Sequence, residues 1–359
     1  MPGSRSGYRP ALDGLRGIAV LAVVAFHAVT LVPGGFLGVD VFFVLSGFLI
    51  TSLLMQEFRN TGKIRLGNFY LRRALRLFPA LALLLSLTTL AGIVAPGPAH
   101  DTVAAVPWAA SFLLNWRLAF RQQEAGLLWH LWSLSVEGQF YLLWAPCVAL
   151  LLGLGMSPRV LFALSLSLTA ISDLCRAFLW NTGASTLRLY HGTDTHLDGI
   201  LLGSALAALV VSVSADAWEP LRGHLKWASR FTWVFLLGLF LSAYQDALVF
   251  SWLYLLVPPA VALVILRLLL VPGGITYRLL TSRSLVSVGR VSYGLYLYHF
   301  PAIRLSRALY PDPFLATLGG LVLAALLTAV SWRVLERPAL RLKAWDHRFL
   351  NLRRIFPGN

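Results

Sequence analysis

The chain has 359 residues, of which 58% are hydrophobic and only 13% are charged, and its formal net charge is +15. A soluble domain is about half apolar and about a quarter charged, so this composition excludes an ordinary soluble globular protein. Lys and Arg collect in the cytoplasmic loops of membrane proteins, which accounts for the positive charge better than nucleic-acid binding does.

Long apolar runs follow one another along the chain and predict an all-α, polytopic membrane bundle of about ten transmembrane helices. The first run follows Arg5 and Arg9 and lacks a convincing cleavage site, which indicates an uncleaved span rather than a signal peptide. The stretch 104–120 is apolar but is interrupted by Pro107 and Asn115, so we expect it to be interfacial or re-entrant. The expected spans are 11–31, 36–56, 77–95, 128–152, 160–180, 197–213, 231–247, 249–270, 291–309 and 315–334.

The distribution of Lys and Arg between the loops predicts that both termini are cytoplasmic. Basic residues gather in 57–76, 214–230 and 271–290, and again at the C-terminal end, which assigns these segments to the cytoplasm. The loops between them, such as 181–196, carry few basic residues and are expected outside. The protein is therefore expected to be a multi-pass protein of the plasma membrane.

One membrane domain at 1–340 and a basic cytoplasmic tail at 341–359 are expected, without an additional soluble domain. Cys147 and Cys175 lie in largely apolar stretches and offer neither a disulfide framework nor a set of four metal ligands. The His and Asp residues of 191–198 match no usual ligand spacing, so no metal site is predicted.

The first predicted helix contains two ionisable residues on one face. Arg16 and His27 are eleven residues apart, which is roughly 1100° of rotation, or about 20° more than three whole turns. At 1.5 Å per residue they are about 16 Å apart along the axis. An ionisable group at this depth is costly and indicates function, although a hydrogen bond between helices is the alternative for His27.

The second span, "GGFLGVDVFFVLSGFLI", contains an acidic residue among aromatic ones. Asp40 needs a partner inside the membrane, and His27 or a buried arginine are the available kinds. Gly34, Gly35 and Gly38 form the small-residue pattern that lets membrane helices approach closely.

An arginine cluster opens the third span in "FYLRRALRLFPA". Arg73 and Arg76 are three residues apart and share a helix face, so their two guanidinium groups could grip phosphates bidentately. The alternative is that the cluster only sets the orientation of the helix and contacts lipid headgroups.

Two further segments contain polar residues near membrane interfaces. In "HLWSLSVEGQFYLLW", Ser133, Glu137 and Tyr141 recur every four residues and share a face, beside Trp132. Such a group could orient a base or bind sugar hydroxyls, or it could be a polar helix end. The segment "VSYGLYLYHFP" adds His299 among tyrosines, where an aromatic belt is the alternative.

Together, "RPALDGLRGIAVLAVVAFH", "GGFLGVDVFFVLSGFLIT", "FYLRRALRLFPA", "WSLSVEGQFYLLW" and "VSYGLYLYHFP" resemble the acyltransferase 3 family of integral-membrane O-acyltransferases over nearly the whole chain. The resemblance implies about ten spans and transfer of an acyl group, usually acetyl, to a hydroxyl of a glycan, a lipid-linked saccharide or an antibiotic. It implies acyl-coenzyme A as co-substrate, no tightly bound cofactor, and the lipid bilayer as surroundings, without nucleic acid.

The family motifs map onto this sequence residue by residue. The Arg-x(10)-His motif falls on Arg16 and His27, the Arg-x-x-Arg motif on Arg73 and Arg76, and the Trp-Ser-Leu-Ser-Val-Glu run on 132–137. Family members often carry a second glutamate where this chain has Gly138.

The resemblance and the residues together predict which side chains act in catalysis and which bind substrate. His27 would act as general base on the acceptor hydroxyl, and Asp40 or Glu137 would hold its tautomer. Direct transfer and an acyl-enzyme both remain open, as does the donor to the oxyanion. A membrane transporter or a flippase-like component of polysaccharide export is the alternative function. The residues expected to bind substrate are Arg16, Arg73, Arg76, Trp132, Ser133, Tyr141 and His299.

Overall fold

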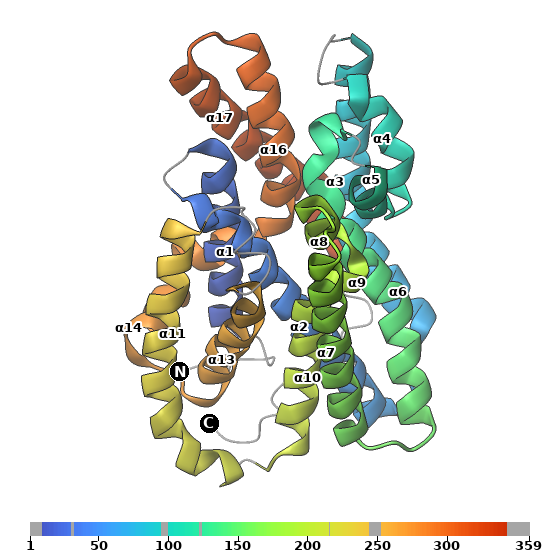
Figure 1. Ribbon diagram of the computed structural model, residues 1–359, viewed down its shortest axis with the longest axis vertical. Coiled ribbons are helices and arrows are strands. Elements are labelled where there is room, and N and C mark those ends of the chain that lie inside the picture. The colour runs from blue at the N-terminus through green and yellow to red at the C-terminus, as the bar shows by residue number, and fades with distance from the viewer. Residues whose placement is uncertain are drawn as a thin grey trace.

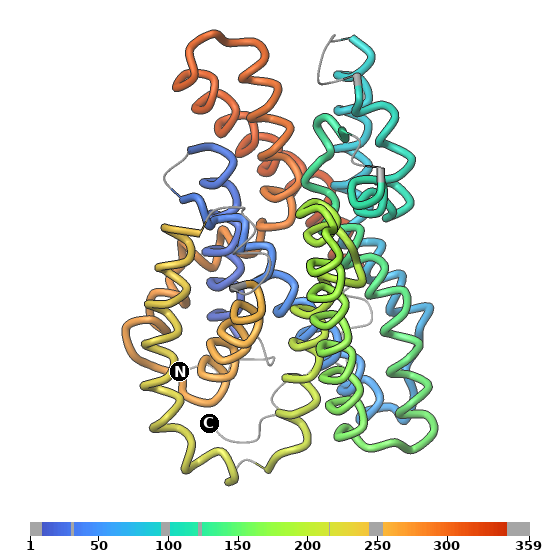
Figure 2. The backbone as a smooth tube through the Cα atoms, viewed as in Figure 1, coloured from blue at the N-terminus to red at the C-terminus, as the bar shows by residue number. Residues whose placement is uncertain are grey.

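The protein is described by a computed structural model, which covers residues 9–29, 32–94, 100–121, 124–214, 216–243 and 253–342. Within these ranges the chain is almost entirely helical and contains no strand, which agrees with the all-α prediction. Figure 1 shows most of the long helices running roughly along the long axis of the molecule, and Figure 2 traces the path of the chain between them.

The longer helices are α1 (Pro10–Ala28), α2 (Gly38–Thr61), α3 (Leu66–Val94), α6 (Trp132–Gly153), α7 (Pro158–Asn181), α10 (Asp198–Ser212), α11 (Arg222–Ser242), α13 (Val257–Leu270), α16 (Ser292–Leu309) and α17 (Pro313–Ser331). Shorter helical segments are η1 (Pro33–Leu37), α4 (His100–Ala110), α5 (Leu114–Arg121), η2 (Gly126–Leu131), α8 (Thr186–His191), α9 (Thr193–His196), η3 (Asp216–Leu221), η4 (Leu253–Leu256), α14 (Gly274–Leu280), α15 (Arg283–Arg290), η5 (Trp332–Glu336) and α18 (Arg337–Leu342).

The prediction of ten spans is wrong in number. Among the described residues, 6 helices are long and apolar enough to cross a membrane, or up to 7 if the bent pair Tyr254–Leu270 and Gly274–Leu280 is one span. The other expected spans fall short because α10 has 15 residues, while α11 and α16 carry polar and basic side chains along part of their length. The orientation of the termini stays a prediction.

The outer surface of the bundle is apolar, as a lipid-facing surface is. Leu143 of α6, Leu174 of α7 and Ile93 of α3 are large hydrophobic residues with exposed fractions of 71%, 69% and 69%. A soluble monomer does not expose apolar area on this scale. Together with the long apolar helices, this makes the chain a multi-pass membrane protein.

The helices that carry the predicted site pack closely through glycines. A Cβ at Gly35 or Gly38 would overlap the backbone carbonyls of α1, as the small-residue pattern in the sequence predicted. The same holds where α2 crosses α10, because a Cβ at Gly47 would overlap the carbonyl of Ile200 and one at Gly203 that of Val44. Helix α2 is therefore fixed between α1 and α10, and its polar residues have defined neighbours.

The predicted boundary between a membrane domain and a tail falls in α18, which runs to Leu342. The tail from 343 onward lies outside the described residues, so the division into 1–340 and 341–359 stays a prediction. The stretch 104–120, expected to be interfacial or re-entrant, forms parts of the two short helices α4 and α5.

Candidate active site

Three predicted substrate-binding arginines line one cavity of about 240 Å³, called here the arginine cavity. Helix α1 contributes Arg16 and helix α3 contributes Arg73 and Arg76, so the i,i+3 spacing does bring the two α3 guanidinium groups to one site. The other polar or aromatic side chains around it are those of Arg9, Phe42, Phe43, Ser46, Phe48, Ser52, Ser133, Glu137, Tyr141, Ser292, Tyr293 and Tyr296.

The arginine cavity has an excess of positive charge. In the part of the chain that the structure describes, no carboxylate lies within ion-pair distance of Arg16, Arg73 or Arg76. The guanidinium carbon of Arg73 lies 5.5 Å from the ring centre of Tyr141, and the Nε of Arg16 is buried without a hydrogen-bond partner. Partly buried guanidinium groups that have no carboxylate ion-pair partner indicate a site for an anionic ligand.

Glu137 is the acidic residue that lines this cavity, and it accepts a hydrogen bond from the hydroxyl of Ser46. Its carboxylate therefore faces the arginines rather than the predicted base, since His27 lines a different cavity. Four arginines, including Arg9, and one carboxylate line the cavity among the described residues, so it keeps a net positive charge.

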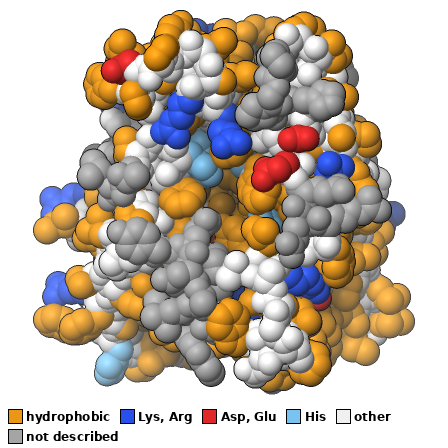
Figure 3. Space-filling model, turned by 45° about the horizontal axis from the view of Figure 1, so that its top comes forward, with side chains coloured by type: hydrophobic (Ala, Val, Ile, Leu, Met, Phe, Trp, Pro, Cys, Tyr) orange, Lys and Arg blue, Asp and Glu red, His pale blue; other side chains and the backbone are white. Residues whose placement is uncertain are grey.

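His27 lines a second cavity of about 360 Å³, called here the histidine cavity. Its wall is mainly aromatic, with Glu124 and Arg304 as the charged residues among its lining. Figure 3 views the molecule with the top of Figure 1 tilted towards the reader. This face is hollowed near a histidine, and Lys or Arg and Asp or Glu side chains lie close to the hollow. The remaining lining residues are Val23, Phe26, Phe36, Val39, Gly126, Trp129, His130, Trp132, Tyr190, Tyr296 and Phe300.

The hydrogen bonds of His27 define its tautomer. His299 Nδ1 donates to the carbonyl of Tyr296 at 2.7 Å, so the Nε2 of a neutral His299 is an acceptor. His27 Nδ1 lies 3.1 Å from that Nε2 and 2.9 Å from the carbonyl of Val23, and both neighbours require a donor. For two neutral imidazoles, His27 therefore carries its proton on Nδ1, and its Nε2 carries a lone pair.

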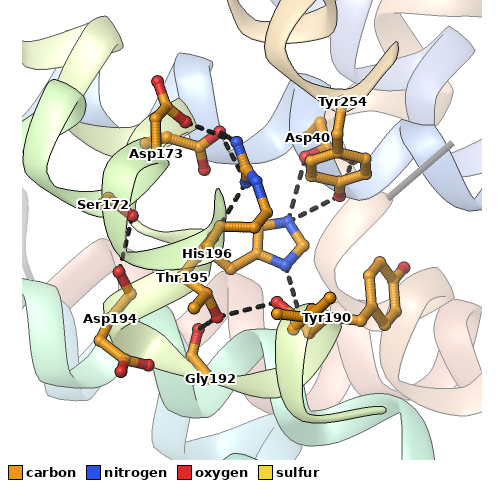
Figure 4. Close-up of polar contacts among 12 residues, drawn as sticks. Asp40, Ser172, Asp173, Tyr190, Gly192, Asp194, Thr195, His196 and Tyr254 are labelled. Carbon is orange, nitrogen blue, oxygen red and sulfur yellow. Dashed lines mark hydrogen bonds and ion pairs between the residues drawn. The ribbon is translucent and has the colours of Figure 1, made fainter. Parts of the chain in front are cut away.

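The expectation that Asp40 orients His27 is wrong. Asp40 belongs to a separate buried network, in which its Oδ1 lies 3.1 Å from His196 Nε2 and its Oδ2 accepts a hydrogen bond of 2.7 Å from the Tyr254 hydroxyl (Figure 4). His196 Nδ1 donates to the carbonyl of Tyr190 at 2.6 Å. Both partners of the Asp40 carboxylate come from distant parts of the sequence, 156 and 214 residues away.

The acidic residues of 191–198 form ion pairs. Arg188 pairs with Asp194 at 2.5 Å, and Arg176 of α7 pairs with Asp198 at 3.2 Å. Arg176 also pairs with Asp173 at 2.5 Å, and Figure 4 shows Asp173 near the His196 network. The Arg188–Asp194 pair joins α8 to α9, and the Arg176–Asp198 pair joins α7 to the start of α10.

Of the other predicted site residues, three line one of the two cavities and His299 lines neither. Ser133 and Tyr141 line the arginine cavity, and Trp132 lines the histidine cavity. His299 is fully buried and contacts His27 directly, with ring centres 5.0 Å apart. Ser46, His130 and Tyr296 also line these cavities, although sequence reasoning did not select them, because the aromatic-belt alternative covered Tyr296 and no spacing singled out the other two.

The second glutamate of the family motif has no room in this chain. A Cβ at Gly138 would lie 2.5 Å from the ring of Phe112. Phe112 itself adopts a φ of 58°, a conformation that costs energy for a residue with a side chain. The ring of Phe112 therefore occupies the space beside Gly138.

Comparisons with known proteins agree on one family. A family model described as an acyltransferase domain matches residues 9–335. The chain is similar to the O-acetyltransferase OatA of Staphylococcus aureus strain NCTC 8325 / PS 47, with 33% identity over 354 residues, which cover 92% of this chain and 57% of that protein. The protein of the same name from strain COL matches to the same extent. The chain thus spans little more than half the length of these relatives. No solved structure matches the chain.

Proposed function

This chain belongs to the acyltransferase domain family that its motifs predicted, and from that premise we propose that it transfers an acyl group from acyl-coenzyme A to a hydroxyl. Acetyl is the expected acyl group, since the O-acetyltransferases OatA are among the relatives. The proposed acceptor is a glycan, a lipid-linked saccharide or a glycosylated metabolite, reached in the plasma membrane.

The observation that carries the proposal is the pairing of the two cavities. Arg16, Arg73 and Arg76 offer an anion site without carboxylate partners, which suits the phosphates of coenzyme A. His27 in the adjoining cavity offers a lone pair on Nε2 to an acceptor hydroxyl. The two cavities share Val39 and Tyr296 in their walls, so a long thioester arm held by its phosphates could reach the base.

The chemistry follows from these positions. His27 Nε2 takes the proton of the acceptor hydroxyl while the hydroxyl oxygen forms a bond to the thioester carbon. The tetrahedral intermediate collapses, the carbon–sulfur bond breaks, and the proton on His27 passes to the thiolate, which leaves as coenzyme A. His299 and the carbonyl of Val23 hold the His27 ring, in place of the carboxylate of a triad.

The mainly aromatic wall of the histidine cavity suits a small organic acceptor. Trp129, Trp132 and Tyr190 supply flat apolar faces, with few polar groups to fix orientation. Asp40 and Glu137 take different parts from those expected: Glu137 would moderate the charge of the arginine cavity, and Asp40 would hold His196 and Tyr254 in place.

The test uses purified full-length protein in vesicles, with radiolabelled acetyl-coenzyme A as donor and glycans extracted from the host membrane as acceptor. Label in the glycan fraction, together with release of coenzyme A thiol, supports the proposal. His27→Ala should abolish both, while His224→Ala is the matched control because His224 is exposed on α11 and lines neither cavity. A folded His27→Ala variant with wild-type turnover would refute the role of His27, and a transporter would release no thiol.

A further inference from the structure

Among the described residues, Tyr296 is the polar residue that lines both cavities. Within the described residues, Val39 and Tyr296 are the residues that line both cavities. Val39 brings only hydrocarbon, whereas Tyr296 of α16 brings a hydroxyl and is 8% exposed. A thioester that is anchored in the arginine cavity and attacked in the histidine cavity must have its carbonyl near this position.

The Tyr296 hydroxyl lies in a small hydrogen-bond group. Its oxygen is 2.6 Å from the hydroxyl of Ser133 and 2.8 Å from the carbonyl of His130. Ser133 lines the arginine cavity and His130 lines the histidine cavity, so the group spans the wall between the two.

The Tyr296 O–H can turn to a new acceptor while the hydroxyls of Tyr296 and Ser133 both remain hydrogen-bonded. If the Tyr296 O–H turns from the His130 carbonyl to a new acceptor, the Ser133 O–H can still donate to the Tyr296 oxygen at 2.6 Å. A hydroxyl whose oxygen accepts a hydrogen bond is a stronger donor, because chains of hydrogen bonds polarise one another.

We propose that the Tyr296 hydroxyl is the catalytic donor that stabilises the oxyanion of the acyl-transfer intermediate, supported by Ser133. This inference rests on the proposed function. As the acceptor oxygen bonds to the thioester carbon and His27 takes its proton, negative charge moves to the former carbonyl oxygen, which the Tyr296 O–H then binds. The charge returns when the carbon–sulfur bond breaks, and the tyrosine keeps its proton throughout.

The neighbouring tyrosines are engaged elsewhere. The hydroxyl of Tyr293 donates to the carbonyl of Leu77 on α3. The hydroxyl of Tyr298 contacts the carbonyl of Ala80 and the hydroxyl of Ser331, and its side chain lines neither cavity. Tyr298 is therefore a matched control: it lies on the same helix and is fully buried.

The experiment compares Tyr296→Phe with Tyr298→Phe by acetyl-coenzyme A titration, using native glycan acceptor and kinetics per folded molecule. Loss of one oxyanion donor lowers kcat about 10²- to 10³-fold. The KM for acetyl-coenzyme A should change less than about threefold, because the phosphates are held elsewhere. Ser133→Ala, which leaves the tyrosine in place, should lower kcat only about 2- to 12-fold, the value of one neutral hydrogen bond.

The outcomes separate this inference from the proposed function. If the wild type transfers acetyl and Tyr296→Phe keeps wild-type kcat, the inference is overturned and the proposed function stands. Equal losses in Tyr296→Phe and Tyr298→Phe would also overturn it, since they would reflect packing alone. If Tyr296→Phe is poorly folded, Ser133→Ala provides the test. An unchanged kcat in Ser133→Ala would show that the Ser133 hydroxyl does not support the Tyr296 hydroxyl as a donor, and it would overturn the inference. A wild type without any acetyl transfer would refute both.

Discussion

Removing an arginine from the arginine cavity should weaken binding of the donor more than it slows the chemistry. Arg73 and Arg76 have no ion-pair partner among the described residues, so their charge is available to a ligand. A hydrogen bond to a charged group contributes about 1.5–3 kcal/mol, which corresponds to about 10- to 150-fold in affinity. We therefore expect Arg73→Ala and Arg76→Ala each to raise the KM for acetyl-coenzyme A by about this factor, with a smaller change in kcat.

Helix α3 provides its own control for this experiment. Arg72 precedes Arg73 directly, but its guanidinium pairs with Glu57 at 3.0 Å and does not line the cavity. Arg72→Ala removes the same charge from the same region and should leave the donor KM unchanged. Lysine keeps the charge but loses the planar fork, so Arg76→Lys should fall between the wild type and Arg76→Ala.

The assay is donor titration on purified variants in vesicles, normalised to folded protein. The competing explanation is that the cluster only orients α3 in the membrane. It predicts lower abundance of all three alanine variants with normal kinetics per folded molecule. A wild-type donor KM in both Arg73→Ala and Arg76→Ala would show that the cavity does not hold the donor phosphates.

Three further predictions test other parts of the structure. Glu137→Gln keeps a hydrogen-bond acceptor for Ser46 but removes the negative charge from the arginine cavity. The KM for acetyl-coenzyme A should therefore fall. A large loss of kcat at unchanged KM would instead show that Glu137 takes part in the chemical step. Asp40→Ala removes the carboxylate that both His196 and Tyr254 contact, although these two side chains remain within 2.7 Å of each other. It should lower the free energy of unfolding by about 1–3 kcal/mol, measured by denaturation in detergent; wild-type stability would contradict this. In a cysteine-free background, a cysteine that replaces exposed Thr182 should react with an impermeant thiol reagent on intact cells. A cysteine that replaces exposed Ser284 should react only after the cells are lysed. The reverse pattern of labelling would invert the predicted topology.

The sequence predicts those parts of the site that depend on helical periodicity. Arg73 and Arg76 meet in one cavity because neighbours at i,i+3 share a face. Arg16 joins them because the first helix places it at the same end of the bundle. The close approach of α1 and α2 likewise follows from local residues, Gly35 and Gly38.

The parts that depend on contacts between distant segments could not be predicted in this way. The sequence offers His27 or a buried arginine as the partner of Asp40, whereas His196 and Tyr254 reach it from elsewhere in the fold. The partner of His27 is His299, 272 residues along the chain, and no local pattern encodes that pairing. The number of spans was overestimated for a related reason: an apolar run shows burial but does not distinguish a full span from a short helix such as α10.

The division into two cavities places conflicting requirements at opposite ends of α1. Binding the phosphates requires several uncompensated cations, while accepting a proton requires an imidazole that keeps a lone pair. At an effective dielectric constant of about 20, a unit charge about 4 Å away interacts with about 4 kcal/mol, and one about 16 Å away with only about 1 kcal/mol. The eleven residues between Arg16 and His27 provide this larger separation through about three turns of a single helix. Because the helix is rigid, the same spacing also fixes how far the acyl arm must extend from its phosphates to reach the base.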